Sequence, residues 1–152
     1  MPLTAVAEVP LDAMGKILTS LTITNRIDQA LAEDGKLPLD QVRSVTLDNV
    51  LVDTGATTLC LATEVIAQLG LKLLKEVQVE TATGISRARI FRDASLCLCD
   101  REGTFECLEL PGGRSALLGV IPLEALGLEP DLQHQTLRIL PIASAETYLT
   151  IL

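Results

Sequence analysis

The sequence predicts a mainly β fold that carries one or two short helices. Runs rich in β-branched residues alternate with polar residues along much of the chain. Pairs of such runs are joined by short turns that contain Gly or Asp, as in hairpins. With 152 residues, the chain is most simply one domain, large enough to bury a core without disulfides or metals.

The first predicted strand is the Thr-rich segment 17–24, whose residues alternate from Ser20 onward. Residues 1–15, interrupted by two prolines, are expected to form an N-terminal arm, so that the domain spans residues 16–152. Asp34-Gly35 marks a turn. The intervening residues 27–32 fit either an extension of the strand or a short helical turn.

A second strand is predicted over residues 42–52, and it leads directly into Asp53. Val45, Leu47 and Asn49 are expected to share one face of this strand. Apolar residues then recur at helical spacing over residues 62–69, which predicts a helix that ends at Gly70.

Two hairpins are expected next. Residues 77–81 and 86–91 form one pair of strands, joined through residues 82–85. Residues 94–99 and 104–110 form the other, turning at residues 100–103.

The last third begins with a break at Pro111-Gly112-Gly113. Residues 115–119 and a short helix over residues 121–128 follow. Residues 136–140 and 148–152 are apolar and strand-like, and segment 136–152 is the one we expect at a subunit interface.

Composition narrows the function. Hydrophobic residues make up 48% of the chain but aromatic residues only 2%, so the core must be aliphatic. A net charge of −8 argues against nucleic acid and against an anionic membrane as partners. The first residues do not resemble a signal peptide, and no apolar run reaches the length of a membrane span. We therefore expect a cytoplasmic protein.

No metal and no cofactor are expected. The four cysteines contain no Cys-x-x-Cys pair and are predicted to be buried thiols, with Cys97 and Cys99 on one strand face; they are Cys60, Cys97, Cys99 and Cys107. The only histidine, His134, lies in a polar segment and is interpreted as a surface turn residue. A Ser–His or Cys–His triad is not expected.

The most informative segment is Val-Asp-Thr-Gly-Ala-Thr-Thr at residues 52–58. It places the carboxylate of Asp53 at the end of an apolar strand, where desolvation is costly unless hydrogen bonds hold the charge. Thr54 and Thr57 lie close enough in sequence to supply such bonds. The alternative is an ordinary polar turn between a strand and a helix.

This segment resembles the active-site loop of the retroviral-type (retropepsin-like) aspartic proteases, in which Asp-Thr-Gly-Ala carries the catalytic acid. Leu117-Leu118-Gly119, followed by a short helix, resembles the element that lies beneath this loop in that family, and it follows Asp53 by about 65 residues, which leaves room for a flap hairpin. Strand, glycine and helix thus occur twice, at residues 51–71 and 117–128. The resemblance extends over about residues 17–140 and implies a closed β-barrel of the acid-protease half-domain type.

The resemblance implies a role for each loop residue. Asp53 would be the catalytic acid and base, and Thr54 would bond to the loop of a partner subunit. Gly55 would let backbone approach the carboxylates, Ala56 would leave room for substrate, and Thr57 would bond the outer carboxylate oxygen. Taken singly, the threonines also fit helix N-caps and the glycine a turn.

The flap tip would lie at Ala82, Thr83, Gly84 and Ile85, with Ile85 over the cleft, although an ordinary surface hairpin fits these residues as well. Hydrolysis of a peptide by carboxylates needs two of them, whereas the chain has a single Asp-Thr-Gly. The resemblance therefore implies a homodimeric aspartic endopeptidase that acts on a peptide or protein substrate. The alternative is a non-catalytic dimeric binding or scaffold module on the same fold.

Overall fold

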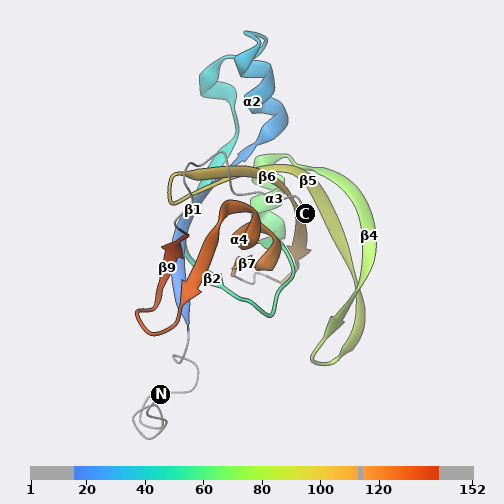
Figure 1. The fold of residues 1–152 in the computed structure, drawn as a ribbon. Coiled ribbons are helices and arrows are strands. Elements are labelled where there is room, and N and C mark those ends of the chain that lie inside the picture. Colours follow the sequence, from blue (N-terminus) through green and yellow to red (C-terminus); the bar gives the residue numbers. More distant parts are fainter. Residues whose placement is uncertain (1–15, 113–114, 141–152) are drawn as a thin grey trace, which may run out of the picture.

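The computed structural model describes residues 16–112 and 115–140, and these form a mainly β fold (Figure 1). In chain order the elements are β1 (Ile17–Asn25), α2 (Arg26–Glu33), the 3-10 helix η2 (Leu39–Gln41), β2 (Ser44–Val52), β3 (Leu59–Ala62), α3 (Thr63–Leu69), β4 (Lys72–Thr81), β5 (Gly84–Leu98), β6 (Arg101–Leu110), β7 (Leu117–Leu118), α4 (Val120–Leu126), β8 (Leu128–Asp131) and β9 (Thr136–Ile139).

The main sheet closes on itself. Its seven strands follow the order β1-β2-β7-β3-β6-β5-β4, and β1 also pairs with β5 through Thr22–Asn25 and Ala94–Cys97. This second pairing joins the first strand of the sheet, β1, to β5 and so closes six strands into a barrel. The last strand, β4, stays outside the closed barrel and, within the described residues, pairs only with β5. Strands β8 and β9 form a separate antiparallel pair. The predicted closed barrel of the acid-protease half-domain type is confirmed.

The barrel interior is aliphatic, as the composition predicts. Ile23, Leu59, Leu61 and Leu118 are completely inaccessible to solvent. Apolar burial of this kind is the main favourable term in folding. The loop-bearing strand β2 ends inside this core at Val52.

The sequence left two possibilities for residues 27–32, an extension of the strand or a short helical turn, and these residues lie in helix α2. Asn25 caps the helix, because its side-chain oxygen accepts a hydrogen bond from the Asp28 backbone N–H at 3.0 Å. The Asp28 carboxylate in turn receives the Arg43 guanidinium, at 2.8 Å from Nε and 3.0 Å from Nη2. This ion pair connects the start and the end of the segment between β1 and β2, which contains α2 and η2 and stands at the top of Figure 1. The described residues thus hold three short α-helices.

The predicted strands 17–24 and 42–52 and the helix 62–69 correspond to β1, β2 and α3, and Gly70 ends α3 in the left-handed conformation. Asn49 does not share the half-buried face of Val45 and Leu47. It is exposed and has a φ of 59°, at an irregularity in the β1–β2 register. This bulge turns Val50 and Val52 into the core.

The second hairpin exists, because residues 94–98 pair antiparallel with the start of β6, but its bounds were predicted incorrectly. Residues 94–98 belong to the same strand, β5, as residues 86–91, and the turn into β6 lies at Cys99-Asp100 rather than at residues 100–103. The strand continues past Asp93 because a bulge there, with φ at 64°, absorbs the charged Arg92-Asp93 pair. The burial prediction is also wrong for Cys97 and Cys99, which are exposed on the outer face of β5 and in the turn; Cys60 and Cys107 are buried.

Strands β3 and β8 were not predicted, whereas β9 corresponds to the predicted strand 136–140. β9 pairs with β8 of the same chain. The predicted arm 1–15 and the segment 148–152 lie outside the described residues. No helix in residues 16–112 and 115–140 is long and apolar enough to span a membrane.

Candidate active site

Asp53 directly follows β2 and begins the loop that leads to β3. Its backbone N–H donates to the Leu118 carbonyl at 3.0 Å, which fixes the start of the loop to β7. Its half-buried carboxylate accepts a hydrogen bond at Oδ1 from the Gly55 backbone N–H at 2.8 Å. The Ala56 N–H closes the turn on the Asp53 carbonyl at 3.0 Å. The loop therefore holds its acid with its own backbone.

Leu117, Leu118 and Gly119 lie directly beneath this loop. β7 runs between β2 and β3, parallel to β2 at Val52 and antiparallel to β3 at Leu59. A Cβ on Gly119 would lie only 2.4 Å from the Thr58 carbonyl oxygen. Gly119 has an ordinary extended φ of −93°, so the need for glycine here is steric rather than conformational.

The first turn of α4 completes the support from below. The Val120 N–H donates to the Ala56 carbonyl at 3.0 Å, and the Ile121 N–H donates to the Thr57 carbonyl at 2.9 Å. Helix N-termini carry unsatisfied N–H groups, and here the loop carbonyls accept two of them. The loop and α4 thus form one hydrogen-bonded unit.

The outward face of the loop is open. Thr54, Gly55 and Thr57 are exposed, and Ala56 is half-buried. Within the described residues, the Thr57 hydroxyl makes no hydrogen bond to Asp53, although that role was predicted from the resemblance. A Cβ on Gly55 would lie 3.1 Å from Asp53 Oδ1, so glycine at this position keeps backbone close to the carboxylate.

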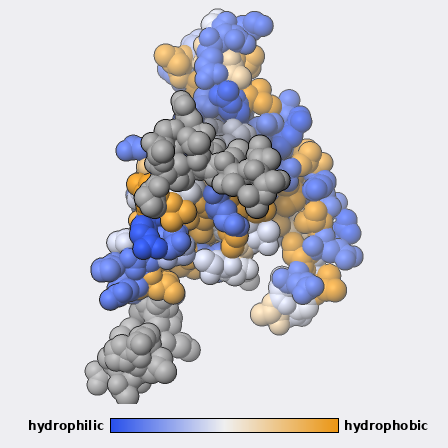
Figure 2. Space-filling model, in the orientation of Figure 1, coloured by the Kyte–Doolittle hydropathy of each residue, from blue (hydrophilic) through white to orange (hydrophobic). Residues whose placement is uncertain are grey.

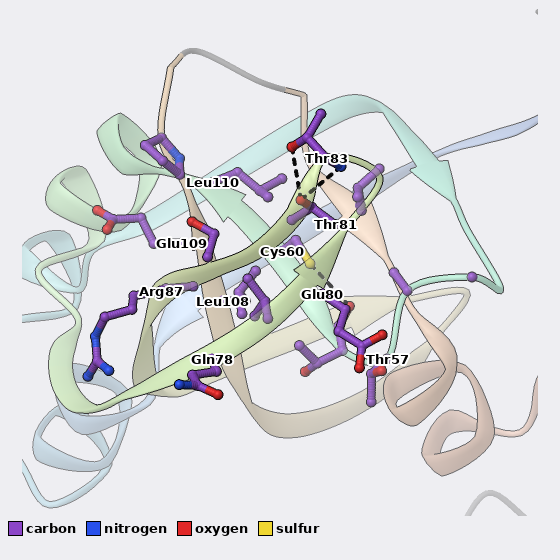
Figure 3. A pocket seen from close by; sticks show the side chains of 18 residues that line it. Thr57, Cys60, Gln78, Glu80, Thr81, Thr83, Arg87, Leu108, Glu109 and Leu110 are labelled. Atoms are coloured by element: carbon purple, nitrogen blue, oxygen red, sulfur yellow. Dashed lines mark hydrogen bonds between the residues drawn. The ribbon is translucent and has the colours of Figure 1, made fainter.

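A cleft of about 690 Å³ adjoins the loop. It lies between the loop, the β4–β5 hairpin and the end of β6 (Figure 3), and in Figure 2 the hairpin end stands apart from the body of the molecule across a hollow. Cys60 on β3 lies opposite both Leu108 on β6 and Leu117 on β7, so these three side chains form a row along the cleft floor. The lining comprises Gly55, Ala56, Thr57, Thr58, Cys60, Gln78, Val79, Glu80, Thr81, Thr83, Ser86, Arg87, Ala88, Leu108, Glu109, Leu110, Pro111 and Leu117.

The predicted flap residues form the tip of this hairpin. Thr81 and Thr83 line the cleft, whereas Ile85 does not belong to the lining and is 72% exposed. The Thr81 hydroxyl donates to the Gly84 carbonyl at 2.8 Å and accepts from the Thr83 N–H at 3.3 Å. Ala82 and Gly84 complete the turn, with Gly84 at a φ of 127°. The tip is thus closed by its own hydroxyl group.

Cys60 is one of several cleft residues that the sequence analysis did not assign to the site. Burial, and secondarily the charge of Asp53, raise the pKa of its thiol to about 11, so it is neutral at physiological pH. Its Sγ donates to the Thr58 carbonyl at 3.6 Å. Strand alternation would have placed Cys60 in the cleft if β3 had been predicted. Among the described residues, no group of three or more His, Cys, Asp or Glu side chains could hold a metal ion.

An Asp-Thr-Gly loop held at a strand crossing of a closed barrel, with the residues that follow its aspartate lining a cleft beneath a hairpin, defines an aspartic-protease half-domain. The family described as gag-polyprotein putative aspartyl protease matches residues 41–125. The chain belongs to this family of retropepsin-like aspartyl protease domains, which supports a protease-type function. The match includes the loop, the hairpin and Leu117-Leu118-Gly119. No match was found among curated proteins.

Proposed function

We propose that the protein is a homodimeric aspartic endopeptidase whose catalytic dyad consists of Asp53 from each subunit. The observation that carries the proposal is that the loop bordering the cleft holds a single carboxyl group, that of Asp53. In residues 16–112 and 115–140, no second carboxyl group is hydrogen-bonded to Asp53. Hydrolysis by carboxylates requires two of them about 3 Å apart, sharing one proton. A second copy of the same loop would supply the missing acid.

The surface around the loop supports this arrangement. Thr54 and Gly55 are exposed, so their outward face is available to a partner loop. Ile121, whose N–H bonds to Thr57, is 50% exposed and adds an apolar side chain beside the loop. An exposed apolar side chain next to an incomplete polar site is a reasonable contact for a second subunit.

The chemistry follows from the dyad. The ionised Asp53 takes a proton from water while the protonated Asp53 donates to the scissile carbonyl oxygen, giving a tetrahedral diol. The carboxyl group that took up the water proton then donates it to the amide nitrogen while the other carboxylate removes a proton from a diol hydroxyl. The C–N bond breaks, a carboxylic acid and an amine leave, and the dyad again holds one proton. The two carboxyl groups titrate as a pair rather than as separate residues.

The cleft indicates the class of substrate. Its floor of Cys60, Leu108 and Leu117 is uncharged, since the Cys60 thiol is neutral. On the hairpin side, Val79 and Ala88 are small and half-buried. We propose peptides with an uncharged, mainly apolar side chain seated on this floor, because a charged side chain would lose hydration there and the charged lining residues Glu80 and Arg87 belong to the hairpin, not to the floor.

The test is cleavage of a diverse peptide mixture between pH 4 and 8 by the native chain and by Asp53→Asn. We expect the variant to lose cleavage while its fold and its dimer mass persist. Asp48→Asn is the matched control, because Asp48 is an exposed residue of β2 that bonds only to Ser20 in the described residues. Its cleavage should equal that of the native chain.

Two results would contradict the proposal. A native chain that remains monomeric at micromolar concentration, even with substrate present, could not form the dyad. A folded dimer that cleaves nothing at any pH would instead indicate the non-catalytic binding or scaffold module.

A further inference from the structure

The β4–β5 hairpin leaves the barrel at a defined residue. Pairing between β5 and β6 ends at Ile90, which lies opposite Leu108. From Arg89 to Gly84, β5 pairs only with β4. Figure 1 shows the hairpin curving away from the barrel beyond this point. The orientation of the hairpin therefore depends on what holds it at Ile90 and Arg89.

A bidentate ion pair lies at this boundary. Arg89 donates from Nε to Glu109 Oε1 and from Nη2 to Glu109 Oε2, both at 2.7 Å. The Glu109 side chain is only 8% exposed, although Glu109 is the second-to-last residue of β6. A nearly buried carboxylate is costly unless it is paired and hydrogen-bonded. The Arg89 hydrogen bonds hold the pKa of Glu109 below its usual range, so the pair stays ionised at neutral pH.

Both partners contact further elements. On the hairpin side, Arg89 faces Glu76 across the β4–β5 ladder, and its guanidinium lies 5.3 Å from the centre of the Phe91 ring. On the barrel side, Glu109 pairs with Leu61 on β3, the strand that leads directly into α3. β3 is the strand that follows the catalytic loop. The ion pair thus links both hairpin strands to the element next to Asp53.

We propose that Arg89 and Glu109 are positioning residues that hold the hairpin against the cleft and set the population of its closed form. A fork-shaped pair fixes orientation as well as distance, because two parallel hydrogen bonds resist rotation about the strand. Hairpins that cover a cleft must open to admit substrate. A lower closed population weakens apparent substrate affinity by the same factor and leaves the chemical step unchanged. This kinetic part rests on the proposed peptidase function, whereas the hairpin motion does not.

The test combines hydrogen exchange with kinetics on the full chain. In Arg89→Met and in Glu109→Gln, backbone amides of residues 75–89 should exchange about fivefold faster than in the native chain. Loss of a fully buried charged pair would have a larger effect, but Arg89 is half exposed and solvent weakens its interaction with Glu109. KM should rise by a similar factor while kcat is kept. Arg89→Lys, which retains the charge but loses the fork, should fall between these variants and the native chain. Arg92→Met is the matched control, since Arg92 is an exposed residue of the same strand, in the part that β1 and β6 hold in the barrel, and its ion pair is with the adjacent Asp93; neither exchange nor kinetics should change.

The double variant Arg89→Met/Glu109→Gln decides whether the two residues act as a unit. If they do, its hairpin exchanges no faster than that of either single variant. Additive effects, or exchange of residues 75–89 that is unchanged in the single variants, would overturn the proposal. A loss of kcat at constant KM would overturn it as well. Absence of cleavage by every form, including the native chain, would contradict the proposed function, and the exchange data would still test the ion pair.

Discussion

Gly119→Ala tests how the Asp53 loop is supported. The added Cβ would lie 2.4 Å from the Thr58 carbonyl oxygen, 2.6 Å from the Thr58 nitrogen and 2.7 Å from the Ala56 carbonyl oxygen. All three neighbours are backbone atoms, so no side chain can rotate away. Ordinary contact begins near 3.4 Å, and the loop or α4 must therefore move by about 1 Å.

The cost can be worked out from the contacts. Overpacking of a close-packed region costs about 1–3 kcal/mol. The movement also strains the hydrogen bonds from Val120 to Ala56 and from Ile121 to Thr57, each worth about 1 kcal/mol. We expect a loss of about 3–5 kcal/mol in the free energy of unfolding, which corresponds to a fall in Tm of about 10 °C for a chain of this size.

Urea unfolding of the native chain, Gly119→Ala and Gly35→Ala measures this loss. Gly35 is the control because a Cβ there meets nothing within 4 Å, and its φ of +70° alone costs about 1 kcal/mol. Gly119→Ala should also reduce peptide cleavage, since the displaced backbone carries Asp53. A free energy of unfolding for Gly119→Ala no lower than that of Gly35→Ala would refute the steric reasoning.

Two further predictions concern acid stability and the hairpin tip. The hydrogen bond from Arg43 lowers the pKa of Asp28, so this carboxylate stabilises the fold above its unfolded-state pKa, and the contribution is lost as the pH falls through the lower folded-state value. Asp28→Asn should therefore lower the urea midpoint at pH 7, and the difference from the native chain should shrink as the pH falls below the unfolded-state pKa; a difference that does not change with pH would contradict this assignment. Thr81→Val removes the hydroxyl bond to Gly84, worth about 1 kcal/mol, and should speed amide exchange at Thr83 without changing global stability. Unchanged exchange at the tip would show that the turn does not depend on this hydroxyl.

The Asp53 loop and the element beneath it could be located from the sequence because each is a short, continuous segment. Asp53 and Gly55 belong to one short segment, and the Leu117-Leu118-Gly119 element has its own pattern. Helix α3 was recoverable because its apolar spacing and the cap at Gly70 lie within one window of residues.

The missed features depend on distant contacts. β3 reads Leu-Cys-Leu-Ala, without alternation, because the barrel core buries one face while the cleft floor covers the other. β5 was divided in two because Arg92-Asp93 looks like a turn, and only pairing with β6 shows that a bulge carries the strand across it. The ion pair between Arg89 and Glu109 joins residues 20 positions apart and leaves no local pattern.

The backbone of the Asp53 loop is fully hydrogen-bonded on one side and open on the other. Beneath it, the carbonyls of Asp53, Ala56 and Thr57 all accept hydrogen bonds, from the loop itself and from α4. Outward, Thr54 and Gly55 are exposed next to a carboxylate that accepts one hydrogen bond from the residues the structure describes. A loop held this firmly from below keeps Asp53 in position without a partner, so dimerisation would supply the second acid rather than build the loop. The free subunit should therefore already present a formed half-site, and Asp53→Asn should abolish cleavage without altering the loop around it.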